Sequence, residues 1–211
     1  MKTIYLIRHA ESMGNAGYKT PNTEENPLSE KGLAQAKELA KRLLPLCNLN
    51  FLVVHSSYKR SWQTAKEFIY LSGIDQSREW PVHEFTYLSA AKYANSSFDE
   101  RLPAKKEYWQ MLDPDYHDDD AESYNDFFNR IAGTLEDIKS SSYPTLFIFS
   151  HQEFIKGLLL SILVKQLEGA VPNMNSFHNF SQSFHIPNTA ILKLLFDGKN
   201  FAISPFNGVP V

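Results

Sequence analysis

The stretch TIYLIRHAESMGN, residues 3–15, contains an apolar run that ends abruptly in arginine and histidine. Residues 3–8 favour β-structure and are apolar on both sides of the pleat. That pattern is typical of a strand in the middle of a sheet whose two faces are both covered. Arg8, His9, Glu11 and Asn15 then follow within a few residues. The stretch therefore predicts a buried strand whose carboxyl end carries polar side chains.

Two later segments repeat this arrangement. FLVVHSS, residues 51–57, and TLFIFSH, residues 145–151, are short apolar runs that end in serine and histidine. Each precedes a segment with helical features, over residues 58–71 and 153–164. Alternation of strands and helices favours an α/β fold with a mainly parallel sheet. We expect a three-layer α/β/α architecture, with residues 1–211 forming a single domain.

Two further helices are predicted from apolar residues at helical spacing. In residues 27–44, Ser29 is a plausible N-cap for a helix, and in residues 123–140 Ser123 and Asp126 resemble a capping box. The residues expected to face the core are Leu33, Ala36, Ala40 and Leu43 in the first helix and Phe127, Ile131, Leu135 and Ile138 in the second.

Residues 72–121 differ from the rest of the chain. They are rich in aromatic residues, proline and mixed charge, and their periodicity is weak. We expect an inserted cap segment over the sheet, with a short helix at residues 105–112. The basic residues of this segment are Arg78, Lys92, Arg101, Lys105 and Lys106. Most of them are expected on a solvated surface, and any that point inward would favour a substrate with a second anionic group. After the third strand-and-helix unit, residues 190–196 and 201–206 predict late strands joined by a turn at Asp197–Gly198.

Length, composition and charge limit the functional class. The chain has 211 residues, with 43% hydrophobic and 21% charged residues, which is ordinary for a globular protein. Its net charge of −3 argues against a dedicated nucleic-acid-binding protein. An anionic substrate stays open, because a local cluster of arginines suffices to bind one.

Cys47 is the single cysteine, so the chain cannot form an internal disulfide. A reducing compartment is the natural interpretation, and Cys47 itself is expected to be a small buried residue near a helix end. We see no signal-peptide pattern at the N-terminus and no apolar stretch as long as a membrane span. The sequence therefore favours a cytoplasmic protein without membrane association.

The candidate catalytic residues lie at or just beyond the ends of the three predicted parallel strands. Arg8 and His9 end the first, Arg60 lies one helical turn beyond the second, and His151 ends the third. Ligands of open α/β sheets bind outside the carboxyl ends of the strands. Arginine provides a planar set of donors that fits phosphate oxygens, and a neutral imidazole is a nucleophile near physiological pH. These residue types together predict phosphoryl chemistry, in which a carboxylic acid would protonate the leaving oxygen.

These residues have two other interpretations. Any one histidine or arginine at a strand end is more often structural. A metal site could include His9, Glu11 and His151. However, no HExxH or cysteine–histidine spacing is present, and the flanking arginines would repel a cation. We therefore expect no metal and no cofactor.

At these positions the sequence resembles the histidine phosphatase superfamily, also called phosphoglycerate mutase-like. Arg-His-Ala-Glu-Ser at residues 8–12, with Asn15, is similar to the first signature of this family. Ala10 stands where that signature has glycine. Further similarity runs in order along the chain, at Pro27–Ala36, at Ser56–Ala65, at Ala121-Glu122-Ser123, at Ser150-His151-Gln152 and at Asn188.

The resemblance implies a role for each matched residue. His9 corresponds to a nucleophile that becomes a phosphohistidine, and Arg8, Arg60 and His151 correspond to the rest of a phosphate pocket. Asn15 and the backbone amide of Gln152 correspond to further contacts to the phosphate. Gln152 stands where the family has glycine, so its side chain could narrow the pocket or contact the substrate.

The resemblance also implies a general acid some two dozen residues after Arg60, where Glu84 stands. Its nearest competitors are Glu79, Asp99 and Glu122. Glu122 is better interpreted as a support for the pocket or for a helix start. Glu11 is expected to be a structural carboxylate that orients the arginines.

The resemblance thus predicts a metal-independent phosphatase, a phosphoric monoester hydrolase of the histidine acid type, acting on a small phosphorylated molecule. A phosphoglycerate-type mutase is the second enzyme hypothesis, although the mutases of the family are longer. A non-catalytic protein that binds a phosphorylated ligand is the third hypothesis, although such a protein would be expected to lose one of these residues. The particular substrate and the oligomeric state stay open.

Overall fold

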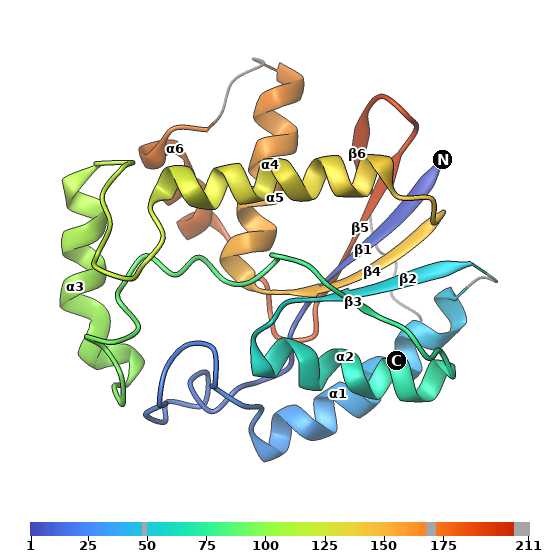
Figure 1. Cartoon of the computed structure of the whole chain (residues 1–211), viewed down its shortest axis with the longest axis horizontal. Helices are drawn as coiled ribbons and strands as arrows, with labels where there is room; N and C mark the ends of the chain where they lie inside the picture. Colours follow the sequence, from blue (N-terminus) through green and yellow to red (C-terminus); the bar gives the residue numbers. More distant parts are fainter. Residues whose placement is uncertain (48–49, 168–171, 205–211) are drawn as a thin grey trace.

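The protein is described by a computed structural model that covers residues 1–47, 50–167 and 172–204. Within these residues, six strands form one sheet in the order β3-β2-β4-β1-β5-β6 (Figure 1). The strands are β1 (Lys2–Arg8), β2 (Phe51–His55), β3 (Arg78–Glu79), β4 (Thr145–Ser150), β5 (Ile191–Phe196) and β6 (Phe201–Ser204). Four neighbouring strands, β3, β2, β4 and β1, are mutually parallel. Strand β5 is antiparallel to β1, and β6 is antiparallel to β5. The prediction of a mainly parallel sheet is confirmed.

The helices cover both faces of this sheet (Figure 1). They are α1 (Glu30–Leu43), α2 (Lys59–Ser72), α3 (Phe98–Met111), α4 (Tyr124–Ser140), α5 (Gln152–Leu167) and α6 (Met174–Ser183), with a 3₁₀ turn η1 (Leu44–Leu46) after α1. Helices α1 and α2 pack on one face, and α4, α5 and α6 pack on the other. This is the predicted three-layer α/β/α arrangement.

Alternation along the central strands assigns each side chain to one of two cores. In β1, Ile4 and Leu6 pack with the α4–α6 layer, whereas Tyr5 and Ile7 pack with the α1–α2 layer. Successive side chains of a strand point to opposite faces, so a strand covered on both sides must be apolar throughout. This explains the continuous apolar run that opens the sequence.

The predicted helix starts are confirmed, with one error in the buried face of α1. Ser29 accepts a hydrogen bond from the Gly32 amide, and Ser123 and Asp126 form a reciprocal capping box. However, Leu33 is 42% exposed, and Gly32 is the buried residue at that turn. The reason is that the chain at Glu11 passes directly over Gly32, leaving no room for a side chain there.

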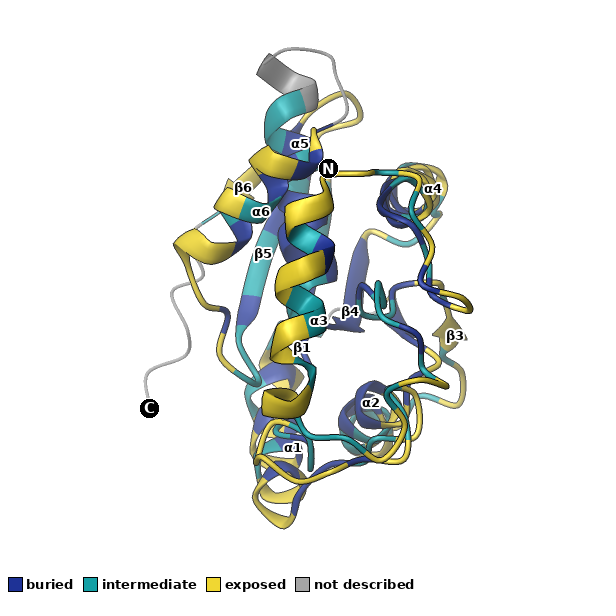
Figure 2. Cartoon of the chain, turned by 90° about the vertical axis from the view of Figure 1, so that its left-hand side faces the viewer, coloured by how far each residue is buried: buried dark blue, intermediate teal, exposed yellow. Residues whose placement is uncertain are grey.

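The segment 72–121 contributes the short β3 and the helix α3, which stands at the left of Figure 1 away from the sheet. Helix α3 begins at Phe98, seven residues earlier than the predicted start at 105. Ser97 and Glu100 form its capping box, a signal that the polar composition and Pro103 obscured. Figure 2 views this side of the molecule and shows α3 as mostly exposed or intermediate; Tyr108 is its buried residue.

The late hairpin also forms as predicted, because β5 and β6 pair through a turn at Asp197 and Gly198. The part of the second predicted strand from residue 205 onward lies outside the described residues. Cys47 follows η1 and is partly buried, and burial raises the pKa of its thiol to about 11. Among the described helices, none is long and apolar enough to cross a membrane.

Candidate active site

Parallel pairing brings the ends of β1, β2 and β4 to one edge of the sheet. Arg8 is opposite Ser150 in the β1–β4 register, and the His9 amide donates to the Ser150 carbonyl at 3.0 Å. The imidazole rings of His9 and His151 lie with their centroids 4.9 Å apart. Two histidines separated by 142 positions therefore share one site, as expected from the strand ends.

The His9 imidazole is held in one tautomer. Its Nδ1 is 2.7 Å from the carbonyl oxygen of Ala10, which can only accept, so Nδ1 carries the hydrogen. Its Nε2 lies 3.1 Å from Nε of Arg60, which can only donate, so Nε2 carries the lone pair. Burial, followed by the charges of Arg60 and Arg8, holds the His9 pKa well below its usual value. The ring is therefore neutral at physiological pH, with Nε2 as its basic atom.

Arg60 and Arg8 supply positive charge next to this imidazole. Arg60, in the first turn of α2, donates from Nη1 to the Thr23 carbonyl and lies over the Tyr58 ring at 5.0 Å. Arg8 donates from Nη1 to the Ile186 carbonyl and to Oε1 of Gln152. The Nε of Arg8 is buried and has no hydrogen-bond partner among the described residues. Arg8 therefore keeps a donor available for an anion.

His151 is fully buried beside His9. Its Nε2 lies 2.7 Å from the hydroxyl oxygen of Ser56, the residue that follows β2. Its Nδ1 is buried with no partner within the described part of the chain. Burial and the charge of Arg60 hold the His151 pKa well below its usual value.

Glu84 reaches the site from the segment after β3. Its Oε1 accepts hydrogen bonds from the amides of Phe85, Glu153 and Phe154, at 3.1, 2.9 and 3.3 Å. Two of these amides belong to the first turn of α5. Burial and the nearby Glu153 carboxylate raise the Glu84 pKa, against the opposing effect of Arg60 and Arg8. A raised pKa is the property that a general acid requires.

The other acidic candidates lie elsewhere. Glu79 and Asp99 are exposed, and neither lines the cavity that contains His9. Glu122 forms an ion pair with Arg130 at 2.7 Å and accepts from the Thr86 amide, so it braces the segment that carries Glu84. This agrees with the supporting role expected of it.

Glu11 is a structural carboxylate, as expected, but its expected partners were wrong. Its carboxylate binds the Ser29 hydroxyl at 2.8 Å and the Lys31 ammonium at 2.7 Å. It forms no ion pair with the site arginines among the described residues. Glu11 therefore secures the start of α1 instead of orienting Arg8 and Arg60.

Asn15 and Gln152 lie at the cavity, but their side chains are engaged with the protein. Asn15 Oδ1 accepts from the side chain of Asn188, which also donates to the His9 carbonyl at 2.9 Å. Gln152 Oε1 accepts from Arg8 and from the Ile186 amide, both at 3.2 Å. The Gln152 side chain thus connects Arg8 to the loop before β5.

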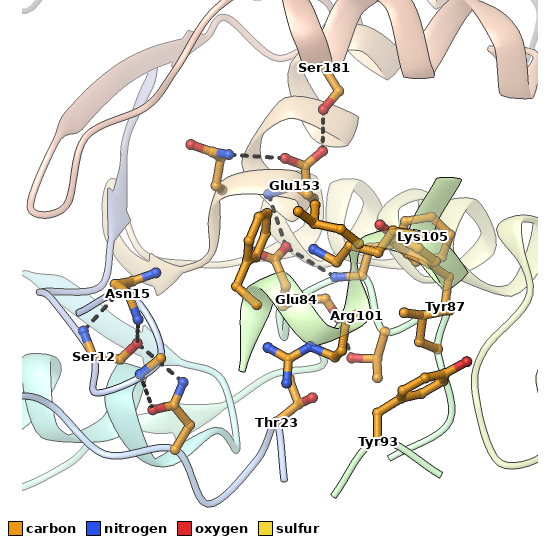
Figure 3. Close-up of a pocket in the computed structure, with 18 of the residues that line it drawn as sticks. Ser12, Asn15, Thr23, Glu84, Tyr87, Tyr93, Arg101, Lys105, Glu153 and Ser181 are labelled. Atoms are coloured by element: carbon orange, nitrogen blue, oxygen red, sulfur yellow. Dashed lines mark hydrogen bonds between the residues drawn. The ribbon is translucent and has the colours of Figure 1, made fainter. Parts of the chain in front are cut away.

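Six of the residues described above line a cavity of about 970 Å³, part of which is drawn in Figure 3. They are Arg8, His9, Asn15, Arg60, Glu84 and Gln152. Figure 3 shows Ser12 and Asn15 at one side and Glu84, Arg101 and Lys105 further across. Sequence reasoning missed Thr23 and Ile186, which contribute only carbonyl oxygens and carry no side-chain signal. It also missed Glu153, although this carboxylate follows the matched Ser-His-Gln directly. Within the described residues, no group of three or more histidine, cysteine, aspartate or glutamate side chains is arranged to hold a metal.

Comparison with known proteins gives a consistent result. A sequence model of the Histidine phosphatase superfamily (branch 1) matches residues 4–208. "Phosphoglycerate mutase-like protein AT74H" of Arabidopsis thaliana is 28% identical over 205 residues, covering 85% of this chain and 70% of that protein. "Phosphoserine phosphatase 1" of Hydrogenobacter thermophilus is 26% identical over 165 residues, covering 77% of each protein.

Solved structures share the fold over nearly the whole chain. A mutant phosphoserine phosphatase from Entamoeba histolytica, in complex with phosphoserine, has a TM-score of 0.71 at 21% identity, with 98% of this chain and 97% of that chain covered. A mycobacterial glucosyl-3-phosphoglycerate phosphatase complexed with VO3 has a TM-score of 0.73 at 20% identity, with coverage of 99% and 100%.

Proposed function

The chain belongs to branch 1 of the histidine phosphatase superfamily and is a phosphatase, and we propose that it hydrolyses small phosphomonoesters through a phosphohistidine formed on His9. The observation that carries this proposal is the His9 imidazole. Its Nδ1 is fixed by the Ala10 carbonyl, and its Nε2 faces the guanidinium of Arg60. A buried, neutral nucleophile between two arginines suits attack on a phosphate dianion.

We assign the phosphate pocket to the cations and the unpartnered donors around His9. Arg8 and Arg60 supply the charge, and the free Nε of Arg8 and Nδ1 of His151 each supply a hydrogen bond. Asn15 and Gln152 both line the cavity, and we assign the Asn15 side chain and the Gln152 amide to the remaining oxygens. Donors already fixed in place stabilise the developing charge without reorganisation.

The reaction then proceeds in two displacements. In the first, the Nε2 lone pair of His9 forms a bond to phosphorus while the bond to the leaving oxygen breaks, and Glu84 gives its proton to that oxygen. In the second, water attacks phosphorus, the Glu84 carboxylate takes a proton from the water, and the bond between phosphorus and Nε2 breaks. Inorganic phosphate leaves, and both residues return to their starting states. The raised pKa of Glu84 supports its assignment as the acid.

The substrate is proposed to be a small metabolite. The cavity volume of about 970 Å³ lies at the upper end of the range of small-molecule sites. Related proteins carry the names phosphoserine phosphatase and phosphoglycerate mutase-like protein. The net charge of −3 supports a protein that does not bind nucleic acid.

We also propose a cytoplasmic location. The support is the cysteine content, because a chain with Cys47 as its one cysteine forms no internal disulfide. Fractionation of cells with antibody detection tests this location, and recovery in a secreted fraction would contradict it.

The function is tested by trapping the intermediate and by varying the leaving group. Rapid acid-free quenching with a ³²P-labelled substrate should give labelled protein in the wild type and none in His9→Ala, whose turnover should fall by several orders of magnitude. Glu84→Gln should slow alkyl phosphates by about 10²–10⁴-fold, while p-nitrophenyl phosphate, with its good leaving group, should slow far less.

Glu122→Gln is the matched control for the acid. Its amide keeps the acceptor for the Thr86 amide, and Glu122 does not line the cavity. A selective loss on alkyl phosphates in Glu122→Gln instead of Glu84→Gln would move the acid role to Glu122. Transfer of label to a second substrate molecule, without release of phosphate, would favour the mutase hypothesis.

A further inference from the structure

Tyr58 lies behind the cavity, in contact both with residues assigned to the phosphate and with the segment that carries Glu84. It is the N-cap residue of α2, two positions before Arg60, and its side chain is buried, with 3% of the residue exposed. Tyr58 does not line the cavity. A bound substrate therefore does not touch it, and any effect of Tyr58 on the reaction must act through its neighbours.

The ring of Tyr58 packs against two residues of the phosphate pocket. The Arg60 guanidinium lies over the ring face, with its Cζ 5.0 Å from the ring centroid. The His151 imidazole meets the ring in an edge arrangement, with centroids 5.3 Å apart and an interplanar angle of 70°. Attraction between a cation and the electron-rich face of a ring is stronger when both are desolvated, and Arg60 is only 4% exposed. The ring therefore holds the guanidinium that faces the His9 imidazole.

The hydroxyl of Tyr58 reaches the other half of the site. It lies 2.7 Å from the hydroxyl oxygen of Thr86. Thr86 donates in turn to the Glu84 carbonyl oxygen at 3.2 Å. A threonine hydroxyl carries one hydrogen, so the Tyr58 hydroxyl must be the donor to Thr86. Burial raises the pKa of Tyr58 to about 12, which keeps this hydrogen in place. A chain of two hydrogen bonds thus ends on the backbone of the general acid.

His83 forms a second connection between Tyr58 and Glu84. Its imidazole stacks on the Tyr58 ring, with centroids 5.2 Å apart and an interplanar angle of 17°. Its Nδ1 lies 3.2 Å from the Glu84 carbonyl oxygen, which can only accept, so Nδ1 is the donor. Arg130 of α4 donates to the same oxygen at 3.5 Å. The two shorter hydrogen bonds to this carbonyl thus both come from residues that contact Tyr58.

We propose that Tyr58 is a positioning residue that couples the phosphate pocket to the general acid, because its ring holds Arg60 and its hydroxyl holds the backbone of Glu84. This inference rests on the proposed function of those two residues. Proton transfer requires the Glu84 carboxyl to lie within hydrogen-bond distance of the leaving oxygen, whose place depends on the bound phosphate. Arg60 and Glu84 come from α2 and from the segment after β3, so a shared contact fixes their separation. A misplacement of about 1 Å can cost on the order of 10²-fold in rate.

Tyr58→Phe tests the hydroxyl, because it removes the donor to Thr86 and retains the ring. We expect kcat for glycerol 3-phosphate to fall about 3- to 10-fold, the effect of one hydrogen bond. The kcat for p-nitrophenyl phosphate should change by less than about 2-fold, since its leaving group needs little help from an acid. Tyr70→Phe is the matched control, because it removes the same atom at an 85% exposed position of α2. Both rates should be unchanged in this control.

Two further variants show whether the hydroxyl acts through Glu84. Thr86→Val interrupts the same chain of hydrogen bonds and should reproduce the selective loss of Tyr58→Phe. The two substitutions combined should be no slower than the slower single variant, because they break one chain. In the Glu84→Gln background, Tyr58→Phe should cause no additional loss on glycerol 3-phosphate. A further loss in that background would contradict an action through the acid.

The ring is tested without a change in its shape. Pentafluorophenylalanine at position 58 removes the electron-rich ring face that attracts Arg60. Compared with Tyr58→Phe, it should raise the Kd of orthovanadate about 3- to 30-fold. Tyr58→Phe alone should leave that Kd unchanged. Lys66→Met is the control for vanadate binding, because Lys66 is an exposed lysine of α2 that does not line the cavity.

The outcomes distinguish this inference from the proposed function. Absence of p-nitrophenyl phosphate hydrolysis in the wild type would contradict the proposed function itself. A selective loss on alkyl phosphates in Glu84→Gln but not in Tyr58→Phe would leave that function in place and overturn the coupling. Equal losses on both substrates in Tyr58→Phe would indicate a purely structural role and would overturn the coupling as well. Vanadate binding that is unchanged by the fluorinated ring would overturn the part assigned to the ring.

Discussion

At the scale of single residues, His9 and Glu84 need opposite protonation states for the first displacement. His9 must be neutral to attack, and Glu84 must hold a proton to release it. Their surroundings act in the required directions, because burial lowers the pKa of His9 and raises that of Glu84. Burial therefore favours a neutral nucleophile, His9, and a protonated acid, Glu84, in one cavity.

This arrangement predicts an acid-shifted pH profile for alkyl phosphates. The decline of kcat/KM on the acid side, where His9 gains its proton, should lie below the usual histidine pKa of 6.5. The decline on the alkaline side, where Glu84 loses its proton, should lie above the usual glutamate pKa of 4.5. The profile of kcat/KM reports the free enzyme, so initial rates at low substrate concentration measure both limbs.

Two controls identify these limbs. With p-nitrophenyl phosphate, the decline at high pH should be weaker, and Glu84→Gln should abolish it. A decline that begins above pH 6.5 on the acid side would contradict the assignment of a neutral, buried His9 as the nucleophile.

The residues that could be predicted from sequence are those whose position depends on local structure. Arg8 and His9 end a strand, and Arg60 lies in the first turn of a helix after another strand, so topology alone brings them together. Thr23 and Ile186 could not be predicted, because they act through backbone carbonyls placed by irregular loops.

At the scale of elements, α1 depends on close contact with the chain that follows β1. A Cβ at Gly32 would lie 1.9 Å from the Glu11 carbonyl oxygen, so this contact requires glycine. The Ser29 amide also donates to that oxygen at 2.9 Å. The segment after β1 that contains Glu11 is thus held directly against the start of α1.

Gly32→Ala should destabilise the protein by about 1–3 kcal/mol or more, because the obstructing atom is backbone and cannot rotate away. Urea unfolding measures the change in the free energy of unfolding. Gly133→Ala is the control, since a Cβ at this exposed position of α4 meets nothing within 4 Å. It should stabilise the protein by roughly 0.5–1 kcal/mol. Equal stability of Gly32→Ala and the wild type would contradict the close approach.

This contact also explains what the periodicity of α1 could not reveal. Leu33 and Gly32 both fit a helical pattern, and hydrophobicity favours Leu33 as the buried residue. The structure buries Gly32 because of a loop 21 positions upstream, a tertiary constraint absent from local sequence. The length of α3 was underestimated for a related reason. Its inward face lines a cavity and carries cations instead of a regular apolar stripe.

At the scale of the whole molecule, the site joins both layers and the inserted segment. A ligand bound there stabilises the folded state only, so it should raise the melting temperature. Orthovanadate at 100 times its Kd should add about 2.7 kcal/mol. For a chain of 211 residues this corresponds to roughly 5–11 °C.

Differential scanning fluorimetry measures this shift. It should be lost in Arg60→Ala, which removes a phosphate-binding cation, and retained in Lys66→Met. Arg101→Met and Lys105→Met should also retain it, because vanadate mimics the transferred phosphoryl group alone. Loss of the shift in these two variants and its retention in Arg60→Ala would place the oxyanion site at α3.

The position of β1 in the sheet has a consequence for how the chain is made. Strand β1 pairs with β4, which begins at Thr145, and with β5, which begins at Ile191, but not with β2. A ribosome therefore releases β1 more than 130 residues before either neighbour, since β1 ends at Arg8 and β4 begins at Thr145. Its apolar residues must wait for that length of chain, which is the situation in which nascent chains bind chaperones or aggregate. Translation thus delivers the nucleophile long before the strands that shelter it.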